Sequence, residues 1–449
     1  MRGLRRARRR VAGRGFRPGP RAGAGRRRPA PTALPRRWPV TGFAVDPTAI
    51  ASDVAALGRI GAQPDGGVTR TTYDPAWVQA RDLVRKMMAD RGLSVRVDAV
   101  GNVYGRLAGT DGSRTVLTGS HLDTVPNGGN YDGALGIVAG IAALDALNRD
   151  RGRPRDNVEV VAFVEEEGTR FGADFLGSRA LVGGADPAEL HATRDVDGVS
   201  VAEAMRAVGL DPGHIGEAKR TDLKAFLELH IEQGPVLEGT GTDLGVVDAI
   251  TSLAVEDARV TGRADHAGTT PITHRADALR AAARMIVAAD ERARACGPPA
   301  TATVGMCRVH PGGANIVAER AEFSLDARHP DPAVLGRLVE EIHQQWQAIA
   351  ATEGVDLAIT PRRVTDGALM DPGLGALLRE AAGVCGASAW TLTSGAGHDS
   401  QVLAPHVPTG MLFVPSRAGR SHCPEEFTEP EHAAIGARVL ATALHQLAY

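Results

Sequence analysis

The strongest constraint on the fold is a series of short apolar runs that alternate with helical stretches. Four of these runs, at 116–119, 158–164, 226–230 and 411–414, are nearly continuous in apolar residues, as strands buried on both faces of a parallel sheet are. An Ala-, Leu- and Ile-rich helix is expected over 132–148. This alternation predicts an α/β catalytic domain with a doubly wound, mainly parallel sheet, whose ligands gather at the carboxyl ends of its strands.

The middle of the chain has a different order of elements. The patterns predict strands at 253–261, 301–309, 321–328 and 355–360, with helices at 276–294 and 332–353. The order β-α-β-β-α-β is that of a ferredoxin-like α+β unit. A chain of 449 residues is also too long for one core to be expected. We therefore predict an inserted domain at 251–363, between two parts of the catalytic domain at 44–250 and 364–449.

The first 43 residues form an Arg-, Pro- and Gly-rich extension. Fourteen arginines and no acids lie in residues 1–37, and without them 53 acidic residues outnumber 37 basic ones. The extension has the charge of a nucleic-acid arm or a transit peptide, but it lacks the apolar residues that order requires, so a disordered extension is favoured. The acidic remainder makes nucleic acid an unsuitable partner.

Two further classes are disfavoured by the sequence. No stretch approaches the roughly 20 apolar residues of a membrane span. The four cysteines, Cys296, Cys307, Cys385 and Cys423, have no CxxC spacing, so neither a disulfide framework nor a thiolate zinc site is indicated. A reducing, cytoplasmic location fits this pattern best.

Imidazoles and carboxylates follow the predicted strands or stand in Gly- and Pro-rich loops. The five candidate metal ligands are His121, Asp132, Glu167, His230 and His422. They are too few for two separate metals with three protein ligands each, but they suffice if Asp132 bridges two metals. Taken singly, each histidine is as well explained by packing in the core or on the surface.

Further acids near these candidate ligands belong to the same interpretation. Asp123 is expected to accept a hydrogen bond from the His121 ring and thereby to fix its tautomer. The run Glu165–Glu167 has two interpretations. It is a solvated acidic turn, or its neighbouring carboxylates have different functions, one binding metal and another moving protons.

These motifs together resemble one branch of a known family. They are HLD at 121–123, NYDG at 130–133, EEEGTRF at 165–171, ELHIEQG at 228–234 and SHCP at 421–424. In this order they are similar to the hydantoinase/carbamoylase branch of the M20 metallopeptidase-like amidohydrolases. The resemblance covers about residues 44–449. Cys423 and Ser400 depart from it, since Ser and Ala are more usual at these positions.

The resemblance implies a ligand set and a general base. His121 and His230 would hold one metal, Glu167 and His422 the other, with Asp132 between them. Glu166 would be the general base. Two divalent ions per subunit are expected, and zinc, manganese, cobalt and nickel all suit such ligands.

The resemblance also implies residues on the substrate side. His266 would reach into the site of the partner subunit, in a homodimer formed through the inserted domain. Asn315 and Arg328 would hold the substrate carboxylate, and Gln233 is a further substrate-side position. Three interpretations are open for His398. It contacts the substrate, it contacts the metal ligands without binding metal itself, or it is a packed loop histidine. Without the family, a loop histidine and a surface ion pair would be favoured for His266 and Arg328.

The implied reaction is hydrolysis of the carbamoyl group of N-carbamoyl-L-amino acids or related ureido acids, with release of carbon dioxide, ammonia and the amino acid. Allantoate amidohydrolase is the first alternative. An M20 peptidase or aminoacylase is a second, although such enzymes more often have Asp-Glu-Glu and a later carboxylate ligand. A non-catalytic binding protein on the same fold is a third. The sequence has no GxSxG nucleophile elbow and no HExxH helix.

Overall fold

The computed structural model describes residues 42–449, in which the larger of the sheets is mixed. Four central strands, β4, β3, β5 and β16, run parallel to one another, and antiparallel strands flank them on both sides. In spatial order the strands are β1 (Ser94–Val97), β2 (Val103–Leu107), β4 (Asn157–Phe163), β3 (Thr115–His121), β5 (Leu223–Ile231), β16 (Thr409–Val414), β6 (Leu244–Ile250) and β14 (Ala368–Leu369), with β15 (Ala389–Ser394) also on β6.

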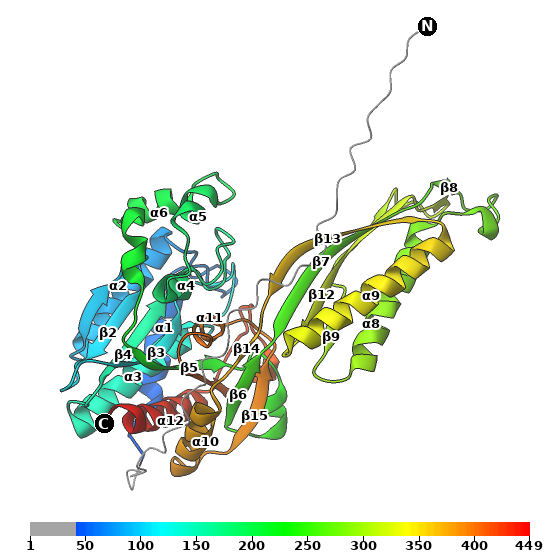
Figure 1. Ribbon diagram of the computed structural model, residues 1–449. Coiled ribbons are helices and arrows are strands. Elements are labelled where there is room, and N and C mark those ends of the chain that lie inside the picture. The colour runs from blue at the N-terminus through cyan, green and yellow to red at the C-terminus, as the bar shows by residue number, and fades with distance from the viewer. Residues whose placement is uncertain (1–41) are drawn as a thin grey trace, which may run out of the picture. The chain divides into compact units, whose positions relative to one another are not determined.

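Helices cover both faces of this sheet, as Figure 1 shows. The helices of this part of the chain are α1 (Pro47–Gly58), α2 (Pro75–Asp90), α3 (Ala134–Arg151), α4 (Leu176–Val182), α5 (Pro187–Ala192), α6 (Val201–Ala207), α7 (Val236–Thr240), α10 (Pro372–Val384), α11 (Asp399–Leu403) and α12 (Pro430–Ala448). Val116 packs with the cluster under α3 and α12, whereas its neighbour Leu117 packs with Leu181 of α4 and Leu403 of α11. This alternation is why the strands are apolar throughout. The predicted α/β fold is confirmed.

Residues 252–365 build a second, antiparallel sheet with its own core. Its strands are β10 (Cys307–His310), β12 (Arg320–His329), β7 (Ser252–Thr261) and β13 (Asp356–Thr365) in spatial order, with β9 (Thr301–Thr303) also on β12. The helices α8 (Ala278–Cys296) and α9 (Pro332–Glu353) pack on each other and on this sheet (Figure 1). Along the chain, β7, α8, β9 with β10, β12, α9 and β13 follow one another in the β-α-β-β-α-β order that the sequence predicts.

Two details of the second sheet differ from the prediction. The expected strand at 301–309 is split around Gly305 into β9 and β10, because a glycine in a strand has no side chain to pack. The expected strand at 355–360 continues through Pro361 to Thr365. Proline is tolerated there because β13 is an edge strand, and the pairing with β7 shifts register between Pro361 and Arg363.

The start of α3 brings the backbone next to Asp132 close to the His121 ring. Helix α3 begins at Ala134, after Gly133 in a left-handed conformation (φ +63°), so Asp132 precedes the helix instead of opening it. A side chain at position 133 would place its Cβ 2.5 Å from the His121 ring. Glycine is therefore required there, both by the backbone conformation and by the close approach of the imidazole.

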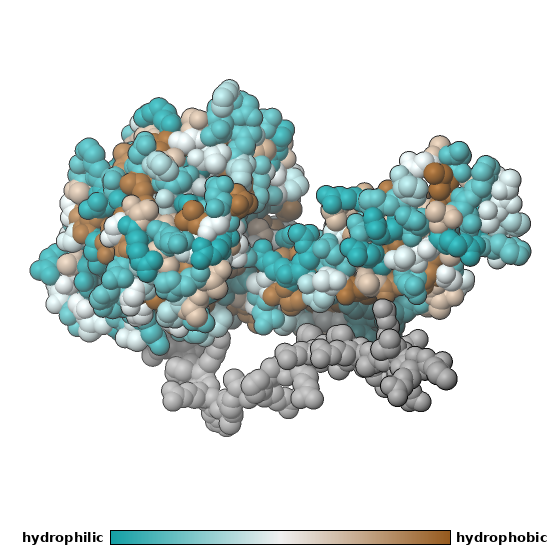
Figure 2. All heavy atoms as spheres, turned by 90° about the horizontal axis from the view of Figure 1, so that it is seen from above, coloured by the Kyte–Doolittle hydropathy of each residue, from teal (hydrophilic) through white to brown (hydrophobic). Residues whose placement is uncertain are grey.

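Hydrophilic side chains cover most of the face shown in Figure 2, and no helix within residues 42–449 is long and apolar enough to cross a membrane. All four cysteines are free. The predicted extension at 1–43 lies outside the described residues, apart from its last two positions.

Candidate metal centre

The sheet brings the predicted ligands to one edge. His121 is the last residue of β3, and His230 lies near the end of its neighbour β5. Glu166 and Glu167 follow β4, and His422 lies in the loop after β16. The carboxyl ends of parallel strands meet here, which is where ligand sites in such sheets are expected.

One group of donors surrounds the first oxygen of Asp132. Its Oδ1 atom lies 3.3 Å from Nε2 of His121 and 3.1 Å from Nε2 of His230. All three side chains are buried, and their donor atoms lie within 4.8 Å of one another. This spacing allows one metal ion to contact all three residues.

A second group surrounds the other oxygen of the same carboxylate. Nε2 of His422 lies 3.2 Å from Oδ2 of Asp132 and 3.4 Å from Oε1 of Glu167. These three residues also form a group with metal-ligating spacing. Asp132 is thus shared between two donor sets.

The hydrogen bonds of the rings show that the donors suit a cation. Nδ1 of His121 donates to the carbonyl of Asp123 (3.0 Å), and Nδ1 of His230 donates to the carbonyl of Ile231 (3.0 Å). In a neutral ring Nε2 then carries a lone pair, which faces the lone pairs of Asp132. Without a cation the rings need a second proton. The pKa of His121 is accordingly raised well above its usual value, since Glu166 and Asp132 outweigh the lowering by burial. A divalent cation between the atoms removes the conflict, and the donor set fits one.

Asp132 is held by residues that sequence analysis did not identify. Glu426 Oε1 accepts from the backbone amides of Tyr131 (2.8 Å) and Asp132 (3.0 Å). Ser421 Oγ lies 3.1 Å from Asp132 Oδ2 and 2.8 Å from Glu426 Oε2. In the sequence, Glu426 is marked only by its position close to His422. Its contact with the backbone amide of residue 131 depends on the fold.

Asp123 accepts a hydrogen bond from the His121 ring, as expected from the sequence. The acceptor is its backbone carbonyl and not its carboxylate. The carboxylate instead accepts from the amides of Glu166 (3.2 Å) and Glu167 (3.1 Å). It is fully buried and therefore fixes the backbone of both acids relative to β3.

The three consecutive glutamates have distinct surroundings. Glu165 is buried with φ +55° and accepts from the Phe171 amide (3.1 Å), so it closes the loop. Glu166 Oε2 lies 3.9 Å from His121 Nε2, and burial raises the pKa of Glu166 well above its usual value. Burial also raises the pKa of Glu167 to about 7. The run is therefore not a solvated acidic turn.

A cavity of about 210 Å³ opens over these groups. It is lined by His121, Asp132, Glu166, Glu167, Phe175, His230, Gln233, Thr251, Leu253, Arg328, Arg363, Thr365, Gly395, Ala396, Gly397, His398, Gln401 and His422. All five predicted ligands belong to this wall, together with four further predicted residues. No motif or pattern in the sequence pointed to Arg363 or Phe175.

Two predicted residues lie elsewhere. His266 is in β8 (Asp265–His266), which pairs with β11 (Ile316–Val317), and Asn315 stands next to that pair. The amide of Ala267 donates to the carbonyl of Asn315 (3.0 Å), so the two residues are neighbours. Neither lines the cavity.

The other substrate-side candidates lie in the cavity wall. Gln233 Nε2 donates to Asp132 Oδ2 (2.9 Å). Nε and Nη2 of Arg328 donate to the Asp326 carboxylate (2.8 and 2.9 Å), and Nη1 donates to the carbonyl of Gly395. His398 is buried, with its ring centroid 4.5 Å from that of His230. Burial and the His230 ring lower the pKa of His398 well below its usual value, so it is a neutral group here.

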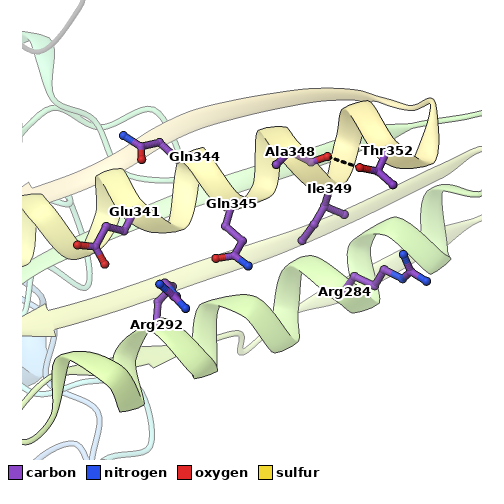
Figure 3. Close-up of a pocket in the computed structure, with 8 residues that line it drawn as sticks. All are labelled: Arg284, Arg292, Glu341, Gln344, Gln345, Ala348, Ile349 and Thr352. Carbon is purple, nitrogen blue, oxygen red and sulfur yellow. Dashed lines mark hydrogen bonds between the residues drawn. The ribbon is translucent and has the colours of Figure 1, made fainter.

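A larger hollow, of about 410 Å³, has no such chemistry. It lies along α8 and α9 and is lined by Arg284, Arg292, Gln345 and Ile349, among others (Figure 3). None of the predicted ligands or substrate-side residues reaches it. Its size does not make it the candidate site.

Comparison with known proteins gives consistent similarities. The sequence model of peptidase family M20/M25/M40 matches residues 117–446. Allantoate amidohydrolase of Escherichia coli (strain K12) is 40% identical over 402 residues, which are 89% of this chain and 98% of that protein. N-carbamoyl-L-amino acid amidohydrolase of Geobacillus stearothermophilus is 41% identical over 395 residues, covering 87% and 96%. A crystal structure of a hydantoinase/carbamoylase family amidase from Burkholderia multivorans superposes with a TM-score of 0.85 at 35% identity, covering 90% and 98%.

Proposed function

The chain belongs to peptidase family M20/M25/M40, and we propose that it is an amidohydrolase that cleaves the carbamoyl C–N bond of N-carbamoyl-L-amino acids or related ureido acids. The observation that carries the proposal is the sharing of Asp132 between two donor sets at the floor of a polar cavity. Relatives named for allantoate and for N-carbamoyl-L-amino acids are about equally similar to this chain. Both kinds of substrate contain a ureido group next to a carboxylate.

We further propose that the site holds two divalent metal ions. His121, His230 and Asp132 would hold one, and Glu167, His422 and Asp132 the other. When bound, such ions supply Lewis acidity that polarises the scissile carbonyl and lowers the pKa of a coordinated water. Zinc, manganese, cobalt and nickel all suit imidazole and carboxylate donors.

Glu166 is the proposed general base. It stands beside the ligands, has no role in closing its own loop, and is held by the contact of its amide with Asp123. It would accept a proton from the attacking water and return that proton to the amino nitrogen as the C–N bond breaks. The carbamate released with the amino acid then decomposes to carbon dioxide and ammonia.

Arg328 is the proposed anchor for the substrate carboxylate. Asp326 already occupies its Nε and Nη2 atoms, which holds the guanidinium in place at the cavity wall. We propose that His266 and Asn315, which lie away from this chain's own cavity, complete the cavity of a partner subunit in a homodimer formed through residues 252–365. A cytoplasmic location is also part of the proposal, because all four cysteines are free.

An ammonia-release assay tests the function. Metal-depleted protein would be reloaded with each metal in turn and given allantoate, 3-ureidopropionate or N-carbamoyl-L-amino acids, with an N-acetyl amino acid and a dipeptide as controls. We expect metal-dependent ammonia release from at least one ureido acid. Cleavage confined to the acetyl compound or the dipeptide would instead indicate the aminoacylase or peptidase alternative, and turnover by verified metal-free protein would contradict the metal mechanism.

A further inference from the structure

Arg363 enters the cavity wall because of an irregularity in β13. Thr360 pairs with Asp257 and Pro361 with Glu256, but the next paired residue is Arg363, opposite Val255. In an unbroken register position 362 would oppose Val255, and residue 363 would point to the other face. The extra residue in β13 therefore turns Arg363 toward the cavity, as bulges beside active sites do.

The restored register aligns Arg363 with other cavity residues. Arg328 of β12 and Thr365 of β13 both pair with Leu253 of β7, so these three residues stand in one row across the sheet. Arg363 lies two residues before Thr365 and therefore on the same face. All four line the cavity. One face of the sheet thus presents two guanidinium groups to the cavity, from strands on either side of β7.

The two arginines are held differently. Arg328 is fixed within its own strand by Asp326. Arg363 has Asp174 as its only ion-pair partner within residues 42–449, at 2.8 Å between Nη2 and Oδ2. The Arg363 side chain remains 44% exposed, and a guanidinium has five donors. Arg363 therefore keeps donors for an additional acceptor in the cavity.

The rest of the cavity wall offers little apolar surface against which an aliphatic group could pack. Of the eighteen lining residues, only Phe175, Leu253 and Ala396 have apolar side chains. An aliphatic substituent placed against Arg363 would remove water from a charged group without replacing its hydrogen bonds, which is unfavourable. An oxygen acceptor at the same place would be favoured, because hydrogen bonds to charged groups are the strong ones.

We infer that Arg363 selects between substrates. It does so by contacting the group that the substrate's α-carbon carries besides the ureido group and the carboxylate. The inference rests on the proposed function, in which Arg328 binds the carboxylate and the ligand side of the cavity takes the scissile ureido group. Arg363 then favours ureido acids whose remaining substituent bears an oxygen acceptor, either a carboxylate or the carbonyl of a second ureido group. Substrates with an aliphatic side chain are disfavoured.

The test compares three substrates on the metal-loaded full chain. Allantoate carries a second ureido group, N-carbamoyl-L-aspartate carries a second carboxylate, and N-carbamoyl-L-methionine carries an apolar side chain. We expect at least one of the first two to exceed the third in kcat/KM by tenfold or more. Which of them leads distinguishes a ureido acceptor from a carboxylate acceptor. In Arg363→Met this preference should fall by on the order of tenfold or more.

Two further variants test whether the effect is specific to the Arg363 charge in the cavity. Arg362→Met changes the neighbouring arginine, which pairs with Asp257 (3.6 Å) and does not line the cavity, and it should leave the preference unchanged. Asp174→Asn frees Arg363 from its neutralising partner and should increase the preference for N-carbamoyl-L-aspartate, the opposite direction to Arg363→Met. Bound metal and melting temperature would be measured for each variant.

The outcomes separate this inference from the proposed function. Hydrolysis of the ureido acids with a wild-type preference for the methionine derivative would overturn the role of Arg363 alone. The same holds if Arg363→Met and Arg362→Met give equal preferences. If metal-loaded wild type releases ammonia from none of the three substrates, the inference fails. The proposed function also fails if 3-ureidopropionate and other N-carbamoyl-L-amino acids release no ammonia either.

Discussion

Asp132 and His230 face each other through two hydrogen-bond acceptors. Oδ1 of Asp132 lies 3.1 Å from Nε2 of His230, while Nδ1 of the same ring donates to the carbonyl of Ile231. A buried contact between two acceptors is unfavourable unless the ring takes a second proton or a cation lies between the two atoms. A divalent cation removes the conflict for both histidines that face Asp132 without adding a proton to either ring.

Replacing Asp132, which belongs to both donor sets, should remove more metal than replacing a histidine that belongs to one set. Asp132→Ala removes the carboxylate common to both donor sets, so we expect loss of both metals and of activity. His422→Ala affects one set and should leave the ion at His121 and His230 bound. Metal analysis by mass spectrometry after gel filtration measures the stoichiometry. Equal metal content in Asp132→Ala and wild type would contradict the shared-ligand arrangement.

Adjacent glutamates should respond differently to the same substitution. Glu166→Gln removes the proposed general base and should lower kcat by about a hundredfold to ten-thousandfold, with metal still bound. Glu165→Gln is the matched control, since its side-chain oxygen can still accept from the Phe171 amide, and most activity should remain. Steady-state ammonia release compares the two. A larger loss in Glu165→Gln would reassign the base.

Arg328 should act on substrate binding. Arg328→Lys keeps the positive charge but loses the planar fork, and we expect KM for carboxylate-bearing ureido acids to rise by on the order of tenfold. A ureido amide that lacks the carboxylate provides the control, because its KM should not change. An unchanged KM for both compounds would refute the anchoring role.

His266 should be required by the partner's site. Its Nδ1 accepts from the amides of Gly268 (3.0 Å) and Thr269 (3.2 Å), which leaves Nε2 directed away from the loop. Mixed dimers of His266→Ala and Glu166→Ala subunits should regain part of the activity that each variant lacks, because one site in each mixed dimer has both residues. Activity would be measured after co-refolding or co-expression. Recovery no greater than in mixtures of separately folded variants would exclude action in trans.

Asp222 should contribute stability that depends on pH. Burial opposes ionisation, but hydrogen bonds from Arg220 (2.5 Å) and Thr115 (2.6 Å) lower the pKa of Asp222 to about 2. A lowered carboxylate pKa stabilises the fold above the unfolded value of about 4, and this contribution is lost as the pH falls toward 2. Asp222→Asn should therefore destabilise the metal-free protein by about 1 kcal/mol at pH 7, a figure reduced for partial solvent exposure.

The measurement for Asp222 is urea unfolding across a pH range. The difference between wild type and Asp222→Asn should stay constant from pH 7 to about pH 5 and shrink below pH 4. Asp197→Asn removes an exposed carboxylate and should have little effect at any pH. A difference that does not change with pH would show that the Asp222 charge is not responsible.

Much of the fold was predictable because it follows from local patterns. Continuous apolar strands indicate a sheet covered on both faces, and period-2 alternation in the middle of the chain indicates a half-covered antiparallel sheet. The errors are also local in cause. Gly305 interrupts one predicted strand, and an edge position allows β13 to continue past Pro361.

The residue types at two strand ends, His121 and His230, and before α3, Asp132, were enough to predict these three ligands from the sequence. Tertiary structure alone decided that the Asp123 carboxylate holds two backbone amides and that Glu426 reaches residue 131. It also decided that a bulge turns Arg363 into the cavity. The physical reason is that ligand identity follows from donor chemistry, which each residue carries with it. Contacts between distant segments depend instead on register and packing, which only the folded chain fixes.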